Sequence, residues 1–326
     1  MSAADSTSHS AGFAFTAGAS PVRLLSESDV ARHLDPRALL DALATGFTWL
    51  ELGEIETPPR PRLSVADAGY SLAMSAWRPG MQMTVKIVNV FDGNHARGLP
   101  SHQALITLFD PDTGAPTCIM DGAGITGVRT AAAAMLSVRL LSRPEAGIAT
   151  IVGAGVQGRE HLRLLPFVRQ LERINVCARN PERAERLVAG NDGAVVRTDV
   201  EAAIRESDII CLTSSAASAV IRPEWVAPGA HVCSVGHQST GGELPRELAE
   251  RHRLFVESLD AFRPSPVGCG ELAGLDPSLG TTLGAVLLGR KPGRLHADEI
   301  TVYKAMGNAM EDLVAANLVY RRLIGG

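Results

Sequence analysis

The sequence predicts an α/β protein in which a doubly wound parallel sheet is joined to an α+β domain. Between residues 146 and 257, short apolar runs alternate with helical segments, which is typical of βαβ units. Between residues 70 and 120, strand patterns follow one another with hairpin turns, which indicates an antiparallel or mixed sheet. A length of 326 residues allows one large domain or two medium-sized ones.

The individual elements follow from periodicity and from turn residues. Proline and glycine mark several of the boundaries between elements. We expect parallel strands at 148–152, 173–178, 194–197, 208–213, 231–235 and 253–257. The other expected elements are a flexible tail (1–21), helices within 22–53, a proline-rich connector (57–62), a long Ala-rich helix (121–142), a loop-rich segment (258–294) and a final helix (298–323).

The composition excludes several classes of protein. The chain is 45% hydrophobic with a formal net charge of −4, and no basic block suggests nucleic acid. No apolar run approaches the roughly 20 residues that cross a bilayer. The five cysteines are widely spaced without a CxxC pair, which is typical of reduced thiols and not of a metal site. We therefore expect a cytoplasmic protein without a metal, a membrane or a nucleic-acid partner.

A glycine-rich turn follows the first strand of the alternating region. It reads Gly-Ala-Gly-Val-Gln-Gly, residues 153–158, and a helical pattern continues to about residue 169. The first glycine permits a tight turn, the second lets a pyrophosphate approach, and the third lets the helix pack closely. The helix N-terminus adds free N–H groups for phosphates. We predict a dinucleotide site that includes Gly153, Gly155, Val156, Gln157 and Gly158.

The residues after the second parallel strand bear on which dinucleotide binds. An acidic residue there commonly binds the ribose 2′-hydroxyl of NAD, but residues 178–180 are Ala-Arg-Asn. Arg179 is placed to face the 2′-phosphate of NADP, with Asn180 and Arg183 beside it. We favour NADP and keep NAD as the alternative. The alternative is that Arg179 is a solvated arginine at the start of a helix and that other residues bind the ribose.

Two more loops follow strands of this sheet. Thr213, Ser214 and Ser215 end the fourth strand, and Gly236 follows the fifth. Because the carboxyl ends of parallel strands face the ligand crevice, these residues are candidates for contact with the cofactor. A plain turn explains the three small hydroxyl residues equally well.

Several stretches besides the glycine turn together resemble the ornithine cyclodeaminase/mu-crystallin family. The resemblance runs from about Val22 to the end of the chain, and the helix containing Arg129 is its most specific part. It rests on Pro59-Arg60, Lys86-Ile87-Val88, Asp121-Gly122, Ile125-Thr126, Arg129-Thr130-Ala131, Gly293-Arg294, residues 300–307 and Glu311-Asp312.

The resemblance implies a homodimer of two-domain subunits. Residues 22–145 and 298–326 would form a substrate-binding and dimerisation domain, and residues 146–297 an NAD(P)-binding Rossmann domain. The family contains cyclodeaminases, ketimine and pyrroline-carboxylate reductases, and alanine dehydrogenases. The resemblance therefore implies chemistry on a small amino or imino acid beside a nicotinamide ring.

Three basic residues match positions that face the substrate in that family: Arg60, Lys86 and Arg129. An arginine can hold a planar carboxylate through two parallel hydrogen bonds. Lys86 stands mid-strand among apolar residues, where burial and nearby arginines would lower its pKa and ease proton donation near neutral pH. An outward-facing Lys86 is the alternative, and Arg62 is the substitute if Arg60 points away.

The loop after the fifth strand departs from the family pattern. Where cyclodeaminases carry an aspartate, this chain has Gln238, preceded by His237. Glutamine cannot act as a base or carry the negative charge that a second substrate amine requires. Gln238 is then a substrate-binding candidate, and His237 is either a proton donor or a polar wall of the crevice.

These residues predict an NAD(P)H-dependent oxidoreductase that reduces the C=N bond of a small 2-imino acid. A cyclic ketimine such as 1-pyrroline-2-carboxylate is the leading example, and an amino-acid or opine dehydrogenase is a close variant. Two alternatives stay open: a cyclodeaminase-type lyase that recycles tightly bound NAD, and a non-catalytic protein that binds NADP and a small ligand.

Overall fold

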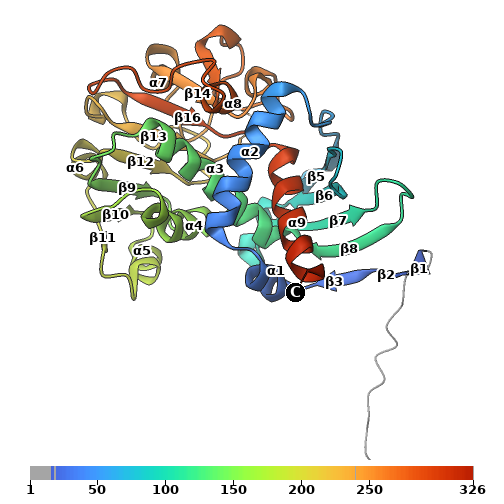
Figure 1. Ribbon diagram of the computed structural model, residues 1–326. Coiled ribbons are helices and arrows are strands. Elements are labelled where there is room, and N and C mark those ends of the chain that lie inside the picture. The colour runs from blue at the N-terminus through green and yellow to red at the C-terminus, as the bar shows by residue number, and fades with distance from the viewer. Residues whose placement is uncertain (1–15, 18–19, 239, 326) are drawn as a thin grey trace, which may run out of the picture.

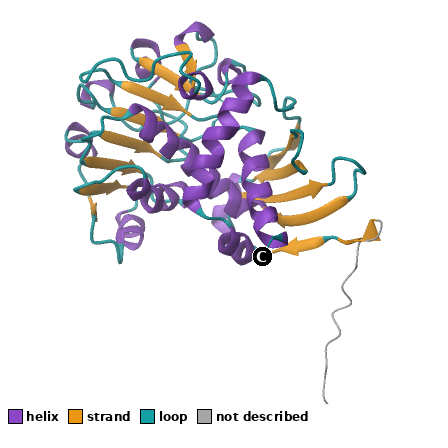
Figure 2. Ribbon diagram, in the orientation of Figure 1, coloured by secondary structure: helices purple, strands orange, loops and turns teal. Residues whose placement is uncertain are grey.

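The computed structural model describes residues 16–17, 20–238 and 240–325, and it shows two sheets with helices between them (Figure 1). The larger sheet has eight parallel strands, and the smaller has six strands that are mostly antiparallel. Helices α2 (Pro36–Leu52), α3 (Gly122–Leu141) and α9 (Ala309–Ile324) lie in the middle layer (Figure 2). The predicted α/β class, with a doubly wound parallel sheet beside an α+β part, is confirmed.

The parallel sheet is wound in both directions from strand β9. Its order is β11-β10-β9-β12-β13-β16-β14-β15. Strands are added on one side of β9 up to β11 and on the other side from β12 onward, and ligands bind at this switch point in such sheets. The strands are β9 (Ile148–Val152), β10 (Arg173–Cys177), β11 (Ala194–Val196), β12 (Ile209–Leu212), β13 (His231–Ser234), β14 (Arg253–Val256), β15 (Gly280–Thr282) and β16 (Thr301–Lys304). Helices α4 (Val156–Leu164), α5 (Pro181–Val188), α6 (Val200–Arg205), α7 (Arg246–Arg251) and α8 (Leu283–Leu287) accompany them.

Three predictions about local structure were wrong. The stretch 298–308 is not helical: residues 301–304 form β16, and the helix begins only at Ala309. The segment expected to be loop-rich contains β15 and α8, and the expected helical region 22–53 begins with strand β3 (Arg23–Leu25). Strand β16 lies between β13 and β14 and is buried on both faces, so it lacks the alternation that marks a strand in sequence.

Side chains of the six-stranded sheet point alternately to a face covered by helices and to an open face. Its order is β3-β8-β7-β6-β5-β4, and α3 and α9 pack on the covered face. In β6, Lys86 and Val88 are buried whereas Ile87 and Asn89 are exposed, as expected for a strand covered on one side. The remaining strands are β4 (Arg62–Val65), β5 (Gly69–Ala76), β6 (Met83–Val90), β7 (His102–Phe109) and β8 (Pro116–Asp121).

Helix α3 connects the two sheets. Asp121 caps its first turn by accepting a hydrogen bond from the Gly124 amide at 2.8 Å, and alanines 131–134 are fully buried. Small side chains let α2, α4 and α9 approach it closely. Within the described ranges, no helix is long and apolar enough to cross a membrane.

The predicted flexible tail, residues 1–21, lies mostly outside the described residues. The described part pairs Thr16–Ala17 (β1) with Ser20–Pro21 (β2) in an antiparallel arrangement. Helix α1 (Glu27–His33) follows β3 and carries a capping box formed by Ser26 and Asp29. The proposed division into domains stays a prediction, although residues 301–304 join the parallel sheet.

Candidate active site

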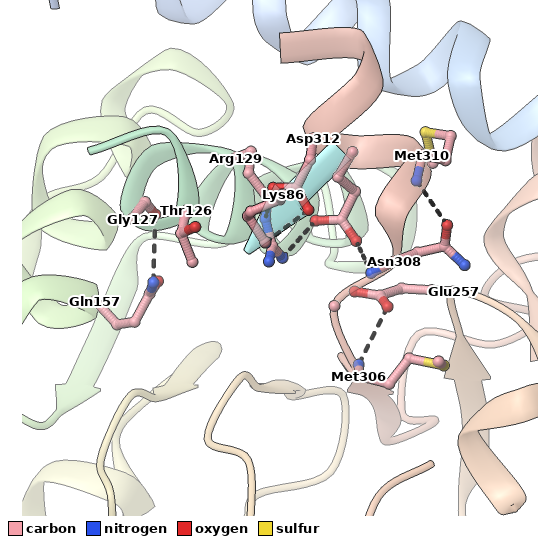
Figure 3. Close-up of polar contacts among 12 residues, drawn as sticks. Lys86, Thr126, Gly127, Arg129, Gln157, Glu257, Met306, Asn308, Met310 and Asp312 are labelled. Carbon is pink, nitrogen blue, oxygen red and sulfur yellow. Dashed lines mark hydrogen bonds and ion pairs between the residues drawn. The ribbon is translucent and has the colours of Figure 1, made fainter. Parts of the chain in front are cut away.

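The glycine turn and the middle of α3 are held together directly. The Gln157 side-chain amide donates a hydrogen bond to the Gly127 carbonyl at 3.3 Å (Figure 3). A Cβ atom at Gly127 would lie 3.1 Å from the side chain of Val156, so a larger residue would press against the start of α4. Arg129 stands two residues further along α3. The predicted nucleotide turn and the predicted substrate residues therefore share one neighbourhood.

Lys86 and Arg129 meet two carboxylates at the start of α9 (Figure 3). The Lys86 Nζ lies 2.6 Å from Oδ2 of Asp312. Arg129 contacts Asp312 through Nε at 3.2 Å and Glu311 through a terminal nitrogen at 3.0 Å. All four side chains are at most 5% exposed, so each charge is matched inside the protein.

The environment of Lys86 lowers its pKa to about 8. Burial is the main cause, Arg129 lowers the pKa further, and the Asp312 carboxylate opposes both. The predicted burial and the predicted direction of the pKa shift both agree with the structure. A lysine with a pKa near 8 is largely protonated at neutral pH and can still release its proton, which suits a general acid.

A third carboxyl group, Glu257, lies behind this cluster. It accepts hydrogen bonds from the Tyr303 hydroxyl at 3.2 Å and from the Met306 amide at 3.1 Å. Burial and the neighbouring Glu311 carboxylate raise the pKa of Glu257 well above its usual value. Its hydrogen bond with the Met306 amide fixes the segment that leads into α9.

Arg60 contacts two loops and not a carboxylate. Its guanidinium donates to the carbonyls of Pro266 and Val267 at 2.7 and 2.8 Å. It also donates to the carbonyls of Met306 and Gly307 at 2.9 to 3.3 Å. These bonds occupy the donors of the guanidinium, so a substrate carboxylate would have to displace some of them. Its predicted contact with substrate stays a prediction.

The glycine turn has the features that a pyrophosphate requires. A Cβ atom at Gly155 would meet nothing within 4 Å, and no side chain caps the N-terminus of α4. The first N–H groups of α4 are thus left for a ligand. At Gly158 a Cβ atom would lie 2.0 Å from the Gly153 carbonyl, so only glycine permits this packing. The residues present fit a dinucleotide phosphate.

Arg179 is exposed after β10, and its guanidinium forms no hydrogen bond or ion pair with another residue in the described part of the chain. Arg183 is also exposed, on α5. Asn180 has a structural task, because its side chain caps α5 by accepting from the Arg183 amide at 3.3 Å. The predicted contact of Arg179 and Arg183 with a 2′-phosphate stays a prediction.

The loops after β12 and β13 are tied to a buried residue, Glu243. It accepts hydrogen bonds from the Ser214 amide at 2.6 Å and hydroxyl at 2.8 Å. It also accepts from the Ser234 hydroxyl at 3.0 Å and from the amides of Val235 and Gly236 at 3.2 and 2.7 Å. The Ser214 hydroxyl therefore donates its hydrogen to Glu243.

The other hydroxyl residues of the β12 loop differ from Ser214. Thr213 donates to the Val152 and Gly153 carbonyls at 3.2 Å, so it supports the glycine turn from behind. Ser215 is exposed, and its carbonyl accepts a hydrogen bond from Gln238 at 3.0 Å. Thr213 and Ser214 thus have structural roles, and their predicted contact with the cofactor stays untested.

His237 is placed among cations. Burial is the main cause that lowers the pKa of His237 to about 3, and Arg60, Lys304, His102 and Arg62 lower it further. Its ring is uncharged at pH 7, so the environment favours the role of a polar wall over that of an imidazolium acid, and the predicted catalytic role stays untested. Asp208 pairs with Arg143, and Asp260 pairs with Arg263.

Comparison with known proteins decides the family. Residues 22–326 match the sequence profile of the ornithine cyclodeaminase/mu-crystallin family. The chain belongs to this family. It is 34% identical to ketimine reductase mu-crystallin of Mus musculus over 304 residues, covering 91% of this chain and 96% of that protein.

Two further members are similar over nearly their whole length. Delta(1)-pyrroline-2-carboxylate reductase of Paracoccus denitrificans is 33% identical over 327 residues, with 93% of this chain and 98% of that one covered. The structure of Thermococcus litoralis Delta(1)-pyrroline-2-carboxylate reductase in complex with NADH and L-proline superposes with a TM-score of 0.88. Its identity is 29%, and the match covers 93% of this chain and 98% of that one.

In this member of the family, several residues of the site could not be assigned from sequence. Glu311 and Asp312 contributed to the resemblance, but their pairing with Arg129 and Lys86 was not foreseen. Glu243, Glu257 and Lys304 were also missed. The available signal was a charged residue inside an otherwise apolar segment: Lys304 follows Thr-Val-Tyr, and Glu257 follows Leu-Phe-Val.

Proposed function

We propose that this chain is an NAD(P)H-dependent oxidoreductase that reduces the C=N bond of a small 2-imino acid. The observation that carries the proposal is the buried Lys86, which has a pKa of about 8 and lies beside Arg129, near the glycine turn. Reduction of an imine needs a hydride at C2 and a proton at nitrogen. When bound, the nicotinamide supplies the hydride, and the protein has to supply the proton and the orientation.

The proton and the orientation come from named residues. Lys86 donates its proton to the imine nitrogen, directly or through one water. The Asp312 carboxylate raises the pKa of Lys86, so that Lys86 is still protonated at neutral pH. Arg129 orients the C2 carboxylate. Arg60 also binds it once one of its hydrogen bonds to a backbone carbonyl is replaced by a hydrogen bond to the substrate. The cyclic ketimine 1-pyrroline-2-carboxylate is our leading candidate, as the Paracoccus and Thermococcus relatives bear its name.

The cofactor proposal separates NADP from NAD. The exposed Arg179 and Arg183 after β10, with no acidic residue at 178–180, support a preference for NADP. The Thermococcus relative was solved with NADH, so NAD is the competing assignment. Gly153, Gly155, Val156, Gln157 and Gly158 would hold the pyrophosphate of either.

We further propose that two copies of the chain associate through the open face of the six-stranded sheet. On that face, leucines and an isoleucine are unusually exposed: Leu24 70%, Leu63 68%, Leu105 58% and Ile87 41%. A contiguous exposed apolar face is typical of an interface between subunits. The five buried free cysteines support a reducing compartment such as the cytoplasm.

The function is tested by following NADPH and NADH absorbance with 1-pyrroline-2-carboxylate, piperideine-carboxylate and acyclic imines. We expect turnover by the wild type and a loss of at least about 100-fold in kcat for Lys86→Met, the range of a lost general acid. Lys291→Met, at an exposed position, is the matched control. Conversion of ornithine to proline with ammonia release would favour the cyclodeaminase alternative. Binding of nucleotide and amino acid without any turnover would favour the binding protein.

A further inference from the structure

Arg62 lies on the same face of the six-stranded sheet as Lys86. Strand β4 pairs with β5 so that Arg62 is opposite Leu72, and β5 pairs with β6 so that Met74 is opposite Lys86. Because side chains alternate along a strand and match across a pair, all four project to the covered face. Arg62 is thus one row of side chains and two strands from Lys86, about 7 Å along the strands and roughly 10 Å across the sheet. Its guanidinium extends to Tyr70, in the row on the far side from Lys86.

The positive charge of Arg62 is not matched by a carboxylate in the described part of the chain. Its guanidinium stacks on the Tyr70 ring, 4.0 Å from the centroid, and its side chain is exposed. Lys86 and Arg129, in contrast, are paired with Asp312 and Glu311. Stacking on an aromatic ring fixes the plane of a guanidinium and leaves its edge donors free.

The loop that faces this region carries no acidic side chain among its described residues 236–238. Gln238 lies in this loop and donates a hydrogen bond to the Ser215 carbonyl. The pKa of His237 is lowered by Arg60, Lys304, His102 and Arg62, in addition to burial. Of the carboxylates near the stacked pair, Asp92 acts on the Tyr70 hydroxyl, and its own side chain is exposed to solvent. Arg62 is thus an exposed cation without an ion pair among the described residues, and an exposed guanidinium of this kind can bind an anion.

We propose that Arg62 binds a second carboxylate, carried by the side chain of the substrate, and that the preferred substrates are dicarboxylic 2-imino acids. The inference rests on the proposed imine reduction and narrows its substrate class: dicarboxylic imines take the place of the monocarboxylic 1-pyrroline-2-carboxylate as the leading candidates. The reaction itself is unchanged: C2 gains a hydride, the imine nitrogen gains a proton, the nicotinamide is oxidised, and both carboxylates stay intact. Arg129 orients the carboxylate at C2, and Arg62 grips the distal one through two parallel hydrogen bonds.

The test compares imines formed in solution from ammonium and 2-oxo acids, with NADPH and with NADH. Oxaloacetate and 2-oxoglutarate give dicarboxylic imines; pyruvate and 2-oxobutanoate give monocarboxylic ones, and 1-pyrroline-2-carboxylate completes the series. We expect kcat/KM for the better dicarboxylic imine to exceed that of every monocarboxylic one by at least about tenfold. Arg62→Gln should lower this ratio at least about tenfold, through KM.

The controls separate recognition from folding. Arg290→Gln removes an exposed arginine on the far segment after α8 and should leave the ratio unchanged. Arg62→Lys keeps the charge but loses the planar fork, so it should restore part of the preference. Thermal melting and NADPH binding show whether each variant is folded, and a fall in the wild-type preference with added salt reports the charge independently of any variant.

The outcomes distinguish this inference from the proposed function. A wild type that reduces monocarboxylic imines as well as or better than dicarboxylic ones overturns the inference and leaves imine reduction standing. A folded Arg62→Gln variant with the wild-type ratio also overturns it. A wild type that turns over no imine with either nucleotide refutes the proposed function, and the inference is refuted with it.

Discussion

The Nζ atom of Lys86 lies 2.6 Å from Oδ2 of Asp312, and each side chain is 1% exposed. Strand β6 supplies the lysine, and helix α9 supplies the aspartate from the other end of the chain. A buried lysine without this carboxylate would lose its proton well below pH 8, since burial and Arg129 both disfavour its charge. The pair therefore sets the pH range over which Lys86 can act as an acid.

A pH profile tests this relationship. Above its pKa of about 8, Lys86 is neutral, so we expect kcat/KM for imine reduction to fall as the pH rises through 8. Asp312→Asn removes the charge that raises the pKa, and the falling limb should move to lower pH. Asp112→Asn, at an exposed hairpin position, should leave the profile unchanged. An unshifted limb in Asp312→Asn would mean that another group limits the rate.

Nucleotide preference is predicted to depend on Arg179. Arg179→Ala should lower kcat/KM for NADPH by about tenfold or more and change that for NADH by less than about twofold, because only NADPH carries the 2′-phosphate. Steady-state kinetics with both nucleotides measure the ratio. Arg186→Ala, in the last turn of α5, is the matched control. An equal loss with both nucleotides would refute the NADP assignment.

Glu243 is predicted to position the loops at the carboxyl ends of β12 and β13. Glu243→Gln replaces one acceptor oxygen with a donor, which leaves at least one buried N–H or hydroxyl unpaired at a cost of about 1–3 kcal/mol. We expect a lower free energy of unfolding in urea and a higher KM for the nucleotide. Glu247→Gln, on the exposed side of α7, should change neither. A drop in stability with an unchanged KM would show that the loops do not touch the cofactor.

The proposed dimer depends on the open face of the six-stranded sheet. Leu105→Glu places a charge opposite Ile87 on that face, and burying it between subunits would be costly. We expect light scattering to report dimers for the wild type and monomers for the variant. Leu295→Glu, exposed elsewhere, should remain dimeric. A monomeric wild type at micromolar concentration would contradict the proposal.

Local sequence patterns predicted most strands of the parallel sheet correctly. The six strands predicted between residues 148 and 257 are all present, because each apolar run is bounded by turn or cap residues. Strands β15 and β16 were missed, since one is three residues long and the other reads as the continuation of a helix. The long helix at 121–142 was recognised from its alanines.

The sequence by itself determined the glycine turn and the arginine after β10, because each follows from residues close together in the chain. The pattern of β6 left both faces open for Lys86, and the structure decided that it is buried. Only the tertiary structure decided what those residues contact. Arg129 and Asp312 are 183 positions apart, and Arg60 and Pro266 are 206 apart. Spacing in sequence carries no information about such pairs, since a crossing helix brings them together. Whether Lys86 keeps a proton, and whether Arg60 or Arg62 is free to bind an anion, is decided by the partners that the fold supplies.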